Sequence, residues 1–263
     1  MVSNLFDIKG KTALVTGGSR GIGLMIARGF VEAGAKVYIS SRKADACERA
    51  AAELSQHGIC IPLAHDLGET NEVHRLADAI KEREPKLDIL INNAGATWGE
   101  PIESYPESGW DKVMNVNVKA VFLLTQALLP VLRAAGTADD PARVVNIGSI
   151  DGLLQPTLET YAYSASKAAV HHLTRNLAKH LARDHIHVNA IAPGPFETKM
   201  LAAVLAAARP AMEAAIPRKR IGMDDDMIGA AIFFCSRASS YVTGAVLPVD
   251  GGITAAAYMA PTP

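Results

Sequence analysis

Short apolar runs rich in β-branched residues recur along the chain, and each is followed by a longer segment with a helical spacing of apolar positions. Apolar runs of about five residues without alternation are typical of strands that are buried on both faces of a parallel sheet. The pattern predicts strands at TALVT (12–16), KVYIS (36–40), DILIN (88–92), RVVNI (143–147), HVNAI (187–191) and AVLPV (245–249).

A seventh, weaker strand is predicted at ICIPL (59–63). Pro62 has no N–H to donate to a neighbouring strand, so we place this strand at an edge of the sheet. Between the strands, segments such as MIARGFVEAGA and ADACERAAAELSQHG have the pattern of amphipathic helices, and Gly58 stands in the C-cap position of the second.

The alternation of strands and helices predicts an α/β fold of the Rossmann type: a doubly wound, seven-stranded parallel sheet with helices on both faces. No linker rich in Gly, Ser or Pro divides the 263 residues. We therefore expect a single dinucleotide-binding catalytic domain over residues 1–263, ending in a C-terminal tail at 254–263.

Composition excludes several functions. The chain has 26 Lys and Arg against 27 Asp and Glu, which argues against a nucleic-acid partner. No apolar run approaches the ~20 residues that cross a bilayer, and the N-terminus has no signal pattern, so we expect no membrane partner.

Cys47, Cys60 and Cys235 are odd in number and scattered, which favours buried thiols and a cytoplasmic location. His171 and His172 adjoin without a third ligand, so we expect no metal site.

The first strand runs directly into the glycine-rich loop TGGSRGIG (16–23). Gly17, Gly21 and Gly23 permit a tight turn and allow backbone N–H groups to approach a pyrophosphate at the positive end of the following helix. A merely flexible loop is the alternative, but the strand before and the helix after it favour dinucleotide binding.

The end of the second strand bears on the choice of cofactor. An NAD site usually has an acid there that binds the ribose 2′-hydroxyl, whereas this chain has Ser40, Ser41 and Arg42. The nearest acid, Asp45, is already in the next helix. Arg42 and Arg20 can pair with a 2′-phosphate, which predicts NADP(H); the alternative is that Arg42 is a solvated surface charge.

YAYSASK (161–167) holds two tyrosines near one lysine. Residues four apart share a helix face, so Tyr163 and not Tyr161 is predicted to act with Lys167. A phenol has a pKa near 10, and a neighbouring ammonium lowers it. Tyr161 is expected to be a lining or packing residue.

Further motifs accompany these in order: Asn92-Asn93-Ala94-Gly95, Asn117 in MNVNVKAVF, Ser149 in NIGS, and Pro193-Gly194 with Thr198. Over nearly its whole length the chain resembles the short-chain dehydrogenase/reductase family, and within it the 3-oxoacyl reductases, including those linked to rhamnolipid synthesis. The resemblance implies an NADP(H)-dependent oxidoreductase with Asn117, Ser149, Tyr163 and Lys167 as catalytic residues.

The resemblance also implies individual roles: Asp66 contacts the adenine, Asn93 lines the cofactor channel, and Thr198 meets the nicotinamide carboxamide. Lys167 grips the nicotinamide ribose, and Asn117 holds a water relay behind it. The implied cofactor-binding set comprises Gly17, Ser19, Arg20, Gly21, Ile22, Gly23, Arg42, Asp66, Leu67, Asn93, Ala94, Gly95, Tyr163, Lys167, Pro193, Gly194 and Thr198. Chemically, Tyr163 supplies a proton and Ser149 hydrogen-bonds the substrate carbonyl oxygen.

Residues 195–222 follow the sixth strand, where this fold has a mobile substrate lid. An apolar face is predicted from Met200, Leu201, Val204, Leu205 and Met212, although an amphipathic helix pair packed on the domain explains the same pattern. The opposite wall is expected from Ile150, Leu153, Leu154 and Gln155, with Trp98 facing them. No charged residue is evidently placed for a carboxylate or sugar phosphate, which favours an apolar ketone or alcohol.

Three functions remain open: reduction of an apolar 3-oxoacyl substrate, oxidation of a sugar, polyol or steroid alcohol, and cofactor sensing without turnover. The resemblance implies a homotetramer, or a homodimer, with helices near 108–135 and 161–183 at an interface. Arginines that dock an acidic carrier protein in related reductases would align with Asp184 and near Pro130, so we expect little dependence on a carrier. The alternative is that Arg133, Arg183 or Lys179 docks the carrier from a shifted position.

Overall fold

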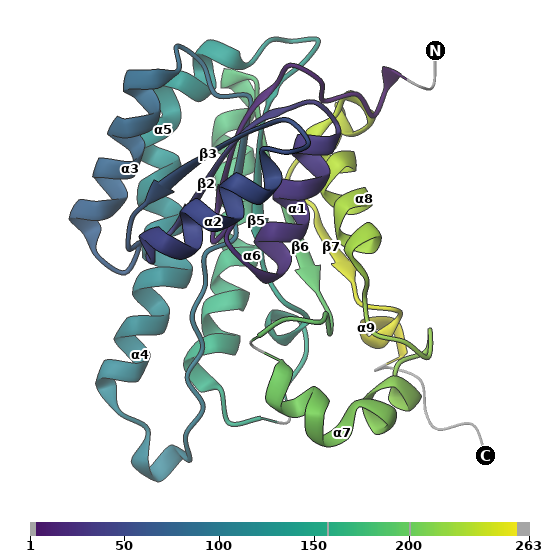
Figure 1. Cartoon of the computed structure of the whole chain (residues 1–263). Coiled ribbons are helices and arrows are strands. Elements are labelled where there is room, and N and C mark those ends of the chain that lie inside the picture. The colour runs from purple at the N-terminus through teal and green to yellow at the C-terminus, as the bar shows by residue number, and fades with distance from the viewer. Residues whose placement is uncertain (1–3, 157, 200, 257–263) are drawn as a thin grey trace.

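The computed structural model describes residues 4–156, 158–199 and 201–256. Its centre is a seven-stranded sheet in the order β3-β2-β1-β4-β5-β6-β7, and every neighbouring pair is parallel. The predicted doubly wound sheet is therefore confirmed (Figure 1). The strands are β1 (Thr12–Thr16), β2 (Lys36–Ser41), β3 (Ile59–Ala64), β4 (Ile89–Asn92), β5 (Ala142–Ile147), β6 (Ile186–Pro193) and β7 (Val246–Val249).

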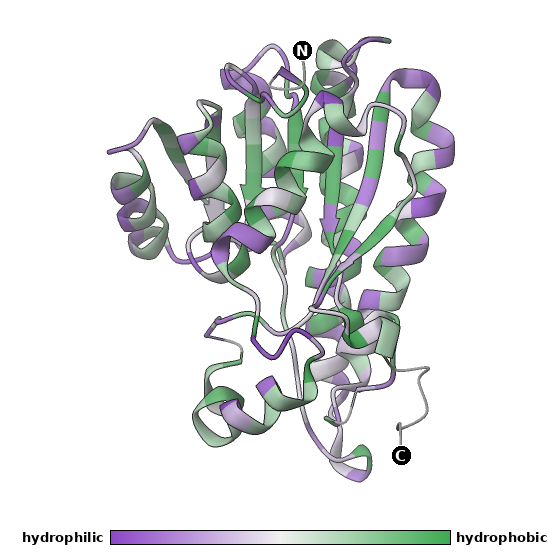
Figure 2. Ribbon diagram, turned by 90° about the vertical axis from the view of Figure 1, so that its right-hand side faces the viewer, coloured by the Kyte–Doolittle hydropathy of each residue, from purple (hydrophilic) through white to green (hydrophobic). Residues whose placement is uncertain are grey.

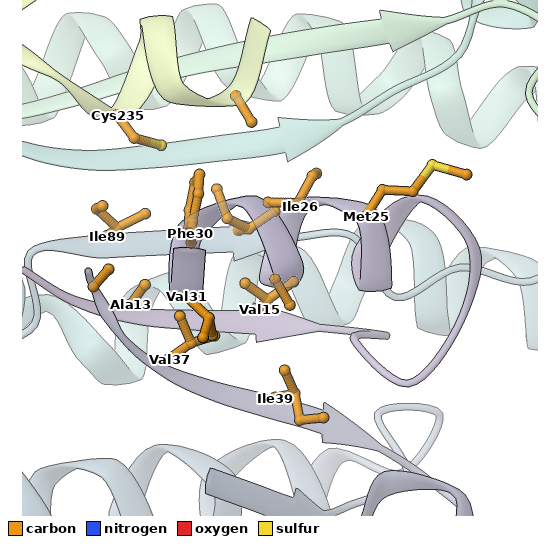
Figure 3. Packing of buried hydrophobic residues seen from close by; sticks show 14 of the residues in the cluster. Ala13, Val15, Met25, Ile26, Phe30, Val31, Val37, Ile39, Ile89 and Cys235 are labelled. Carbon is orange, nitrogen blue, oxygen red and sulfur yellow. The ribbon is translucent and has the colours of Figure 1, made fainter. Parts of the chain in front are cut away.

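Each face of the sheet is covered by helices with its own apolar core. One core joins the sheet to α1 (Gly21–Glu32), α2 (Ala44–Leu54) and α8 (Asp224–Cys235), and Figure 3 shows part of it around Phe30 and Val15. The other joins it to α3 (Thr70–Arg83), α5 (Ala120–Ala135) and α6 (Tyr161–Leu181). The strands are mostly apolar and the helices mix apolar with polar positions (Figure 2), as their burial requires.

β3 lies at the edge of the sheet, as its proline predicts. The predicted C-cap at Gly58 is wrong, because α2 ends at Leu54 with Ser55 as its C-cap. Gly58 has a packing role instead: a Cβ atom there would lie 2.9 Å from a side-chain carbon of Val31, at the end of α1.

The strand order reverses between β1 and β4, whose carboxyl ends therefore diverge into separate loops. Ligands in open parallel sheets bind outside the carboxyl ends at such a switch point. The glycine loop after β1 and the Asn93 loop after β4 meet there, so the fold brings the two predicted cofactor motifs together.

The longest helical stretch runs from α4 (Glu107–Met114) through the π-helical turn η3 (Asn115–Lys119) into α5. This 29-residue stretch is the one span in the described residues that is long and apolar enough, by composition alone, to cross a bilayer. A core helix of a soluble protein passes the same test, and α5 has buried residues that pack against the sheet and α3 and share an apolar core with α6.

The segment 195–222 lies beyond the carboxyl ends of β6 and β7, near α9 (Ile253–Ala256) (Figure 1). Its base is closed by a bridge between Phe196 and Gly222. It contains α7 (Ala202–Ala215), which is kinked at Ala208 and includes Pro210. Short 3-10 turns elsewhere are η2 (Ile102–Ser104), η4 (Ile150–Gly152), η5 (Ala182–Asp184) and η6 (Arg237–Ser239).

Candidate active site

The glycine loop between β1 and α1 has the geometry of a phosphate cradle. Gly17 and Gly21 have positive φ angles of 67° and 54°, which glycine adopts without steric cost. A Cβ atom at Gly23 would lie 2.4 Å from Asn93 Nδ2, so this position is closed to larger residues. Arg20, the N-cap of α1, makes no side-chain capping bond. The first N–H groups of the helix are thus available to an anion.

Thr16, which the sequence reading did not single out, ties this loop to the one after β4. Its Oγ1 accepts hydrogen bonds from the backbone N–H groups of Asn93 (2.9 Å) and Ala94 (3.0 Å) and donates to the carbonyl of Ile91 (3.2 Å). Asn93 Nδ2 donates to the carbonyl of Thr16 at 2.8 Å. These bonds fix the two walls of the crevice in which the cofactor motifs lie.

The residues around the end of β2 fit a 2′-phosphate. Arg20, Arg42 and Lys43 are exposed, and none forms an ion pair within the described residues. Asp45 lies in α2 with its carboxylate 3.4 Å from Arg49. Because free cations and no acid flank β2, this edge is electrostatically suited to a phosphate.

The remaining predicted cofactor residues also lie at carboxyl ends of strands. Asp66 follows β3, is exposed, and accepts a hydrogen bond from the Gly68 N–H at 3.0 Å, while Leu67 beside it is buried. Pro193 ends β6, and the Gly194 N–H donates to the Val249 carbonyl at 2.9 Å. Ser19 and Ile22 are half-buried in the glycine loop. The fold brings them to one edge; their cofactor contacts stay predictions.

Tyr163 and Lys167 lie on one face of α6. Lys167 is 5% exposed, its Nζ donates to the Ile147 carbonyl at 2.8 Å, and that nitrogen lies 5.5 Å from the centre of the Tyr163 ring. Ser149 follows β5 and is buried, and its Oγ accepts the Asp151 N–H at 3.1 Å. Three of the four predicted catalytic residues therefore converge at the end of β5.

Burial dominates the acid–base properties of the pair. It lowers the pKa of Lys167 to about 8 and raises the pKa of Tyr163 to about 12, although hydrogen bonding to Ser149 acts to lower the pKa of the phenol. The sequence predicted a phenol pKa below its ordinary value. In the folded protein, burial and the nearby Asp151 carboxylate act in the opposite direction.

Tyr161 is turned away from this pair. Its ring meets the edge of Tyr105 with ring centres 5.7 Å apart, and its hydroxyl donates to Glu159 Oε1 at 2.8 Å. Hydrogen bonding to that carboxylate raises the pKa of Tyr161. The packing role predicted for Tyr161 agrees with these contacts.

Asn117 lies in the π-helical turn η3 and is 1% exposed. Its Oδ1 accepts the Ala96 N–H at 2.8 Å, and its Nδ2 donates to the Ala96 carbonyl and to Ser166 Oγ, both at 2.9 Å. The side chain thus joins the loop after β4 to α6 beside Lys167. Ser166 was not predicted; it follows Tyr163 by three residues and bonds to that residue's carbonyl at 2.7 Å.

A pocket of about 480 Å³ opens between the glycine loop and the segment 195–222, and Gly21, Thr198 and Leu205 line it. Contrary to the sequence reading, charged residues also line it: Glu197, Lys199 and Arg209. Arg209 is held by Glu197 at 2.8 Å and by Glu213 at 3.5 Å. The charge of Arg209 is therefore balanced within the segment.

The apolar residues of this segment pack mainly on one another. Leu205, Ile216 and Ile221 form a buried cluster against which Leu201, Met212 and Ile253 pack. Val204 is half-buried, and Met200 lies outside the described residues. The alternative interpretation, an amphipathic packing helix, thus accounts for most of the pattern. Among the residues of this set that the structure describes, only Leu205 lines the pocket.

On the opposite wall, Ile150, Leu153 and Leu154 are half-buried and Gln155 is exposed. The position of Trp98 opposite this wall stays a prediction, and its contacts lie on α4. A Cβ atom at Gly109 would lie 2.8 Å from the Trp98 ring, and Lys112 Nζ lies 5.3 Å from the ring centre, so Trp98 packs on α4.

No group of three or more possible metal-binding side chains occurs in the described part of the chain.

Comparison with known proteins identifies the family. A family model described as enoyl-(acyl carrier protein) reductase matches residues 17–254. The chain belongs to the short-chain dehydrogenase/reductase family. This short-chain dehydrogenase/reductase is an oxidoreductase that acts on CH–OH and C=O groups.

Its relatives differ in substrate. It is 49% identical over 249 residues to the rhamnolipids biosynthesis 3-oxoacyl-(acyl-carrier-protein) reductase of Pseudomonas aeruginosa, covering 94% of this chain and 97% of that protein. It is 37% identical over 255 residues to a gluconate 5-dehydrogenase of Gluconobacter oxydans, covering 95% and 97%. The solved RhlG/NADP active-site complex of Pseudomonas aeruginosa matches with a TM-score of 0.93 and 48% identity over 95% of this chain and 99% of that one.

Proposed function

We propose that this enzyme uses NADPH to reduce the carbonyl of an apolar 3-oxoacyl compound to a hydroxyl group. The observation that carries the proposal is the 49% identity to a 3-oxoacyl reductase over 97% of that protein. Ala202, Leu205 and Ala206 of the segment 195–222 line the pocket beside its charged residues and offer an acyl chain an apolar surface.

NADP(H) fits the residues present. Its pyrophosphate suits the uncapped start of α1. Its 2′-phosphate suits Arg20, Arg42 and Lys43, which form no ion pair with any residue that the structure describes. The relative solved as an NADP complex supports the same assignment. In the reaction NADPH supplies a hydride to the carbonyl carbon.

The protein's own residues handle the oxygen. The Ser149 hydroxyl donates a hydrogen bond to the substrate oxygen and stabilises the charge that develops there. The Tyr163 O–H transfers its proton to that oxygen, and the resulting phenolate is stabilised by the Lys167 ammonium. Buried Lys167 is kept in place by the Ile147 carbonyl. Asn117 holds the loop after β4 beside Lys167. Its second role, binding a water relay behind the lysine, is inferred from the family resemblance.

The surface supports substrates that are free or joined to coenzyme A over those joined to a carrier protein. Asp184 occupies the position of one expected docking arginine. Arg133, a possible replacement from α5, is engaged by Asp184 through two hydrogen bonds of 2.8 and 3.0 Å. The charge of Arg133 is therefore neutralised by Asp184, and this pair offers no net positive charge to an acidic carrier protein.

Oxidation of a sugar acid is the second candidate. Gluconate dehydrogenases are among the relatives, and Lys199, exposed at the pocket, has no ion-pair partner within the described residues. Such a lysine is suited to a substrate carboxylate. Cofactor sensing without turnover is disfavoured by the convergence of Ser149, Tyr163 and Lys167.

For the assembly we propose a homotetramer, or a homodimer, in the cytoplasm. Trp110 and Phe122 are 42% and 41% exposed along α4 and α5, and Ala165 and Ala168 are exposed on α6. These surfaces suit helix packing between copies. The three cysteines are free and buried, in keeping with a reducing compartment.

The test is a panel of substrates with the intact enzyme. NADPH consumption is measured with acetoacetyl and longer 3-oxoacyl thioesters and with 5-ketogluconate, and NADP⁺ reduction with gluconate and steroid alcohols. We expect 3-oxoacyl compounds to have the highest kcat/KM, which rises with chain length. A higher value for 5-ketogluconate or gluconate contradicts the proposal and favours the sugar-acid alternative.

A further inference from the structure

His171 follows Lys167 by four residues on α6, so both side chains lie on the same face of the helix. It is 2% exposed. Its neighbour His172 is exposed. The proposed chemistry uses no histidine, so the burial of His171 behind the catalytic pair needs its own explanation.

The His171 ring lies against two glycines that bracket the serine segment 149–151. A Cβ atom at Gly148 would lie 2.0 Å from His171 Nε2, and one at Gly152 would lie 2.9 Å from its Cε1. Neither glycine has a positive φ angle. The absence of side chains at 148 and 152 therefore reflects the space that the neighbouring helix, including this imidazole, occupies.

The imidazole is buried with poor hydrogen bonding: neither ring nitrogen has a partner of good geometry among the described residues, although the Gly152 backbone lies close enough to favour the protonated ring. Burial and the Lys167 ammonium lower the pKa of His171 to about 4, and of the groups around it only the Gly152 backbone acts in the opposite direction. The ring is thus neutral at neutral pH. Unpaired buried nitrogens cost free energy, and such exceptions call for a functional reason.

Ser149 is held from its other sides by backbone bonds. The Gly148 N–H donates to the Ile191 carbonyl at 2.7 Å, and Ser149 Oγ accepts the Asp151 N–H at 3.1 Å. The His171 ring and the neighbouring backbone of α6 lie against the other side of the segment. We propose that His171 is a positioning residue, whose neutral imidazole packs against Gly148 and sets the place of the Ser149 hydroxyl beside Tyr163. This inference rests on the catalytic role proposed for Ser149.

The first test is a double-mutant cycle on kcat with the preferred 3-oxoacyl thioester. We expect His171→Ala to lower kcat about tenfold or more, because small displacements of a reacting group are costly. The NADPH dissociation constant and the substrate KM stay within about twofold. His171→Gln, which refills the space, restores most of kcat, and His172→Ala changes nothing.

Combined with Ser149→Ala, the His171→Ala substitution has little further effect on kcat if it acts through Ser149. Independent, multiplying losses overturn the positioning role, since a general structural defect would add to the loss of the serine. Full activity in Ser149→Ala alone contradicts the proposed function of that residue, and the positioning role with it.

The two glycines give a second test with a built-in control. Gly148→Ala is expected to impair activity in the otherwise unchanged enzyme and to be largely rescued by His171→Ala, which vacates the space for its methyl group. Gly152→Ala meets the α6 backbone, 2.6 Å from Lys167 C and 2.7 Å from Ala168 N, and cannot be rescued in this way. Equal losses from Gly148→Ala in both backgrounds overturn the proposal, whether measured as activity or as yield of folded protein.

Discussion

At the scale of residues, the proposed preference for NADPH depends on Arg20, Arg42 and Lys43, for which the described part of the chain offers no ion-pair partner. We expect NADPH to bind more tightly than NADH, and Arg42→Ala to remove most of the difference, because a charge-assisted bond to the 2′-phosphate contributes about 1.5–3 kcal/mol. Titration of the two cofactors by fluorescence measures it. Arg49→Ala, which removes an exposed arginine of the same helix region, is the control. Equal affinities in the unmodified enzyme contradict the NADP(H) assignment.

Lys167 gives a prediction on stability and pH. Because burial lowers its pKa to about 8, the unfolded chain binds more protons than the folded one from about pH 8 up to the ordinary lysine value near 10.4. The cost of burying the charge is complete below pH 8 and is relieved as pH rises. Lys167→Met should therefore be more stable than the unmodified enzyme at pH 7, by an amount on the order of 2–3 kcal/mol.

The measurement is urea unfolding at pH 7 and at pH 9.5, with the exposed Lys179→Met as control. The advantage of Lys167→Met should shrink at the higher pH, whereas the control should show no such change. A constant difference between the two pH values would show that the lysine is not desolvated in the folded protein.

At the scale of elements, the segment 195–222, which we propose to be a substrate lid, is anchored at its end by a bidentate ion pair. Arg220 donates to both carboxylate oxygens of Asp226 in α8, at 2.6 and 2.9 Å, and lowers the pKa of Asp226 to about 2. Arg220→Gln should raise the substrate KM about threefold to tenfold with a smaller effect on kcat, because the pair orders the base of the lid. Steady-state kinetics of Arg220→Gln and of the exposed Arg218→Gln would separate this from loss of surface charge. Matching KM values in the two variants rule out the anchoring role.

The strands and the glycine loop could be predicted from sequence because their signals are local: continuous apolar runs, and glycines directly after the first of them. The four-residue spacing likewise distinguished Tyr163 from Tyr161. Contacts between distant segments could not be read in this way. Three contacts depend on the folded arrangement of segments that are separate in the sequence: the packing of Trp98 on Gly109, the ion pair of Arg209 with Glu197, and the burial of His171 against Gly148.

The π-helical turn around Asn117 shows a second limit. A π turn differs from an α turn only in the register of its backbone hydrogen bonds, so no residue type in the sequence predicts it. Thr16 and Ser166 were missed for a related reason: each looks like an ordinary small polar residue until its partners, Asn93 and Asn117, are known. The pKa of Tyr163 was misjudged because the degree of burial is a property of the folded molecule.

At the scale of the whole molecule, the charge on the surface predicts how the substrate is delivered. Since Arg133 is engaged by Asp184, one acyl group should be reduced with similar kcat/KM whether it is joined to coenzyme A or to an acyl carrier protein. The comparison is made at low and at high salt, because attraction between charged surfaces is screened by salt. A large carrier advantage that disappears at high salt would reveal a basic docking surface and contradict this prediction.

The central claim is that the fold places one particular phenol, Tyr163, to protonate the substrate oxygen beside Lys167. The most direct measurement is single-turnover oxidation of NADPH by Tyr163→Phe and Tyr161→Phe with the same 3-oxoacyl thioester, after both variants are shown to bind NADPH like the unmodified enzyme. Loss of the proton donor should lower the rate by about 10²-fold or more in Tyr163→Phe, while Tyr161→Phe should keep most of its activity. Substantial turnover by Tyr163→Phe, or a reversed order of the two variants, would contradict the account.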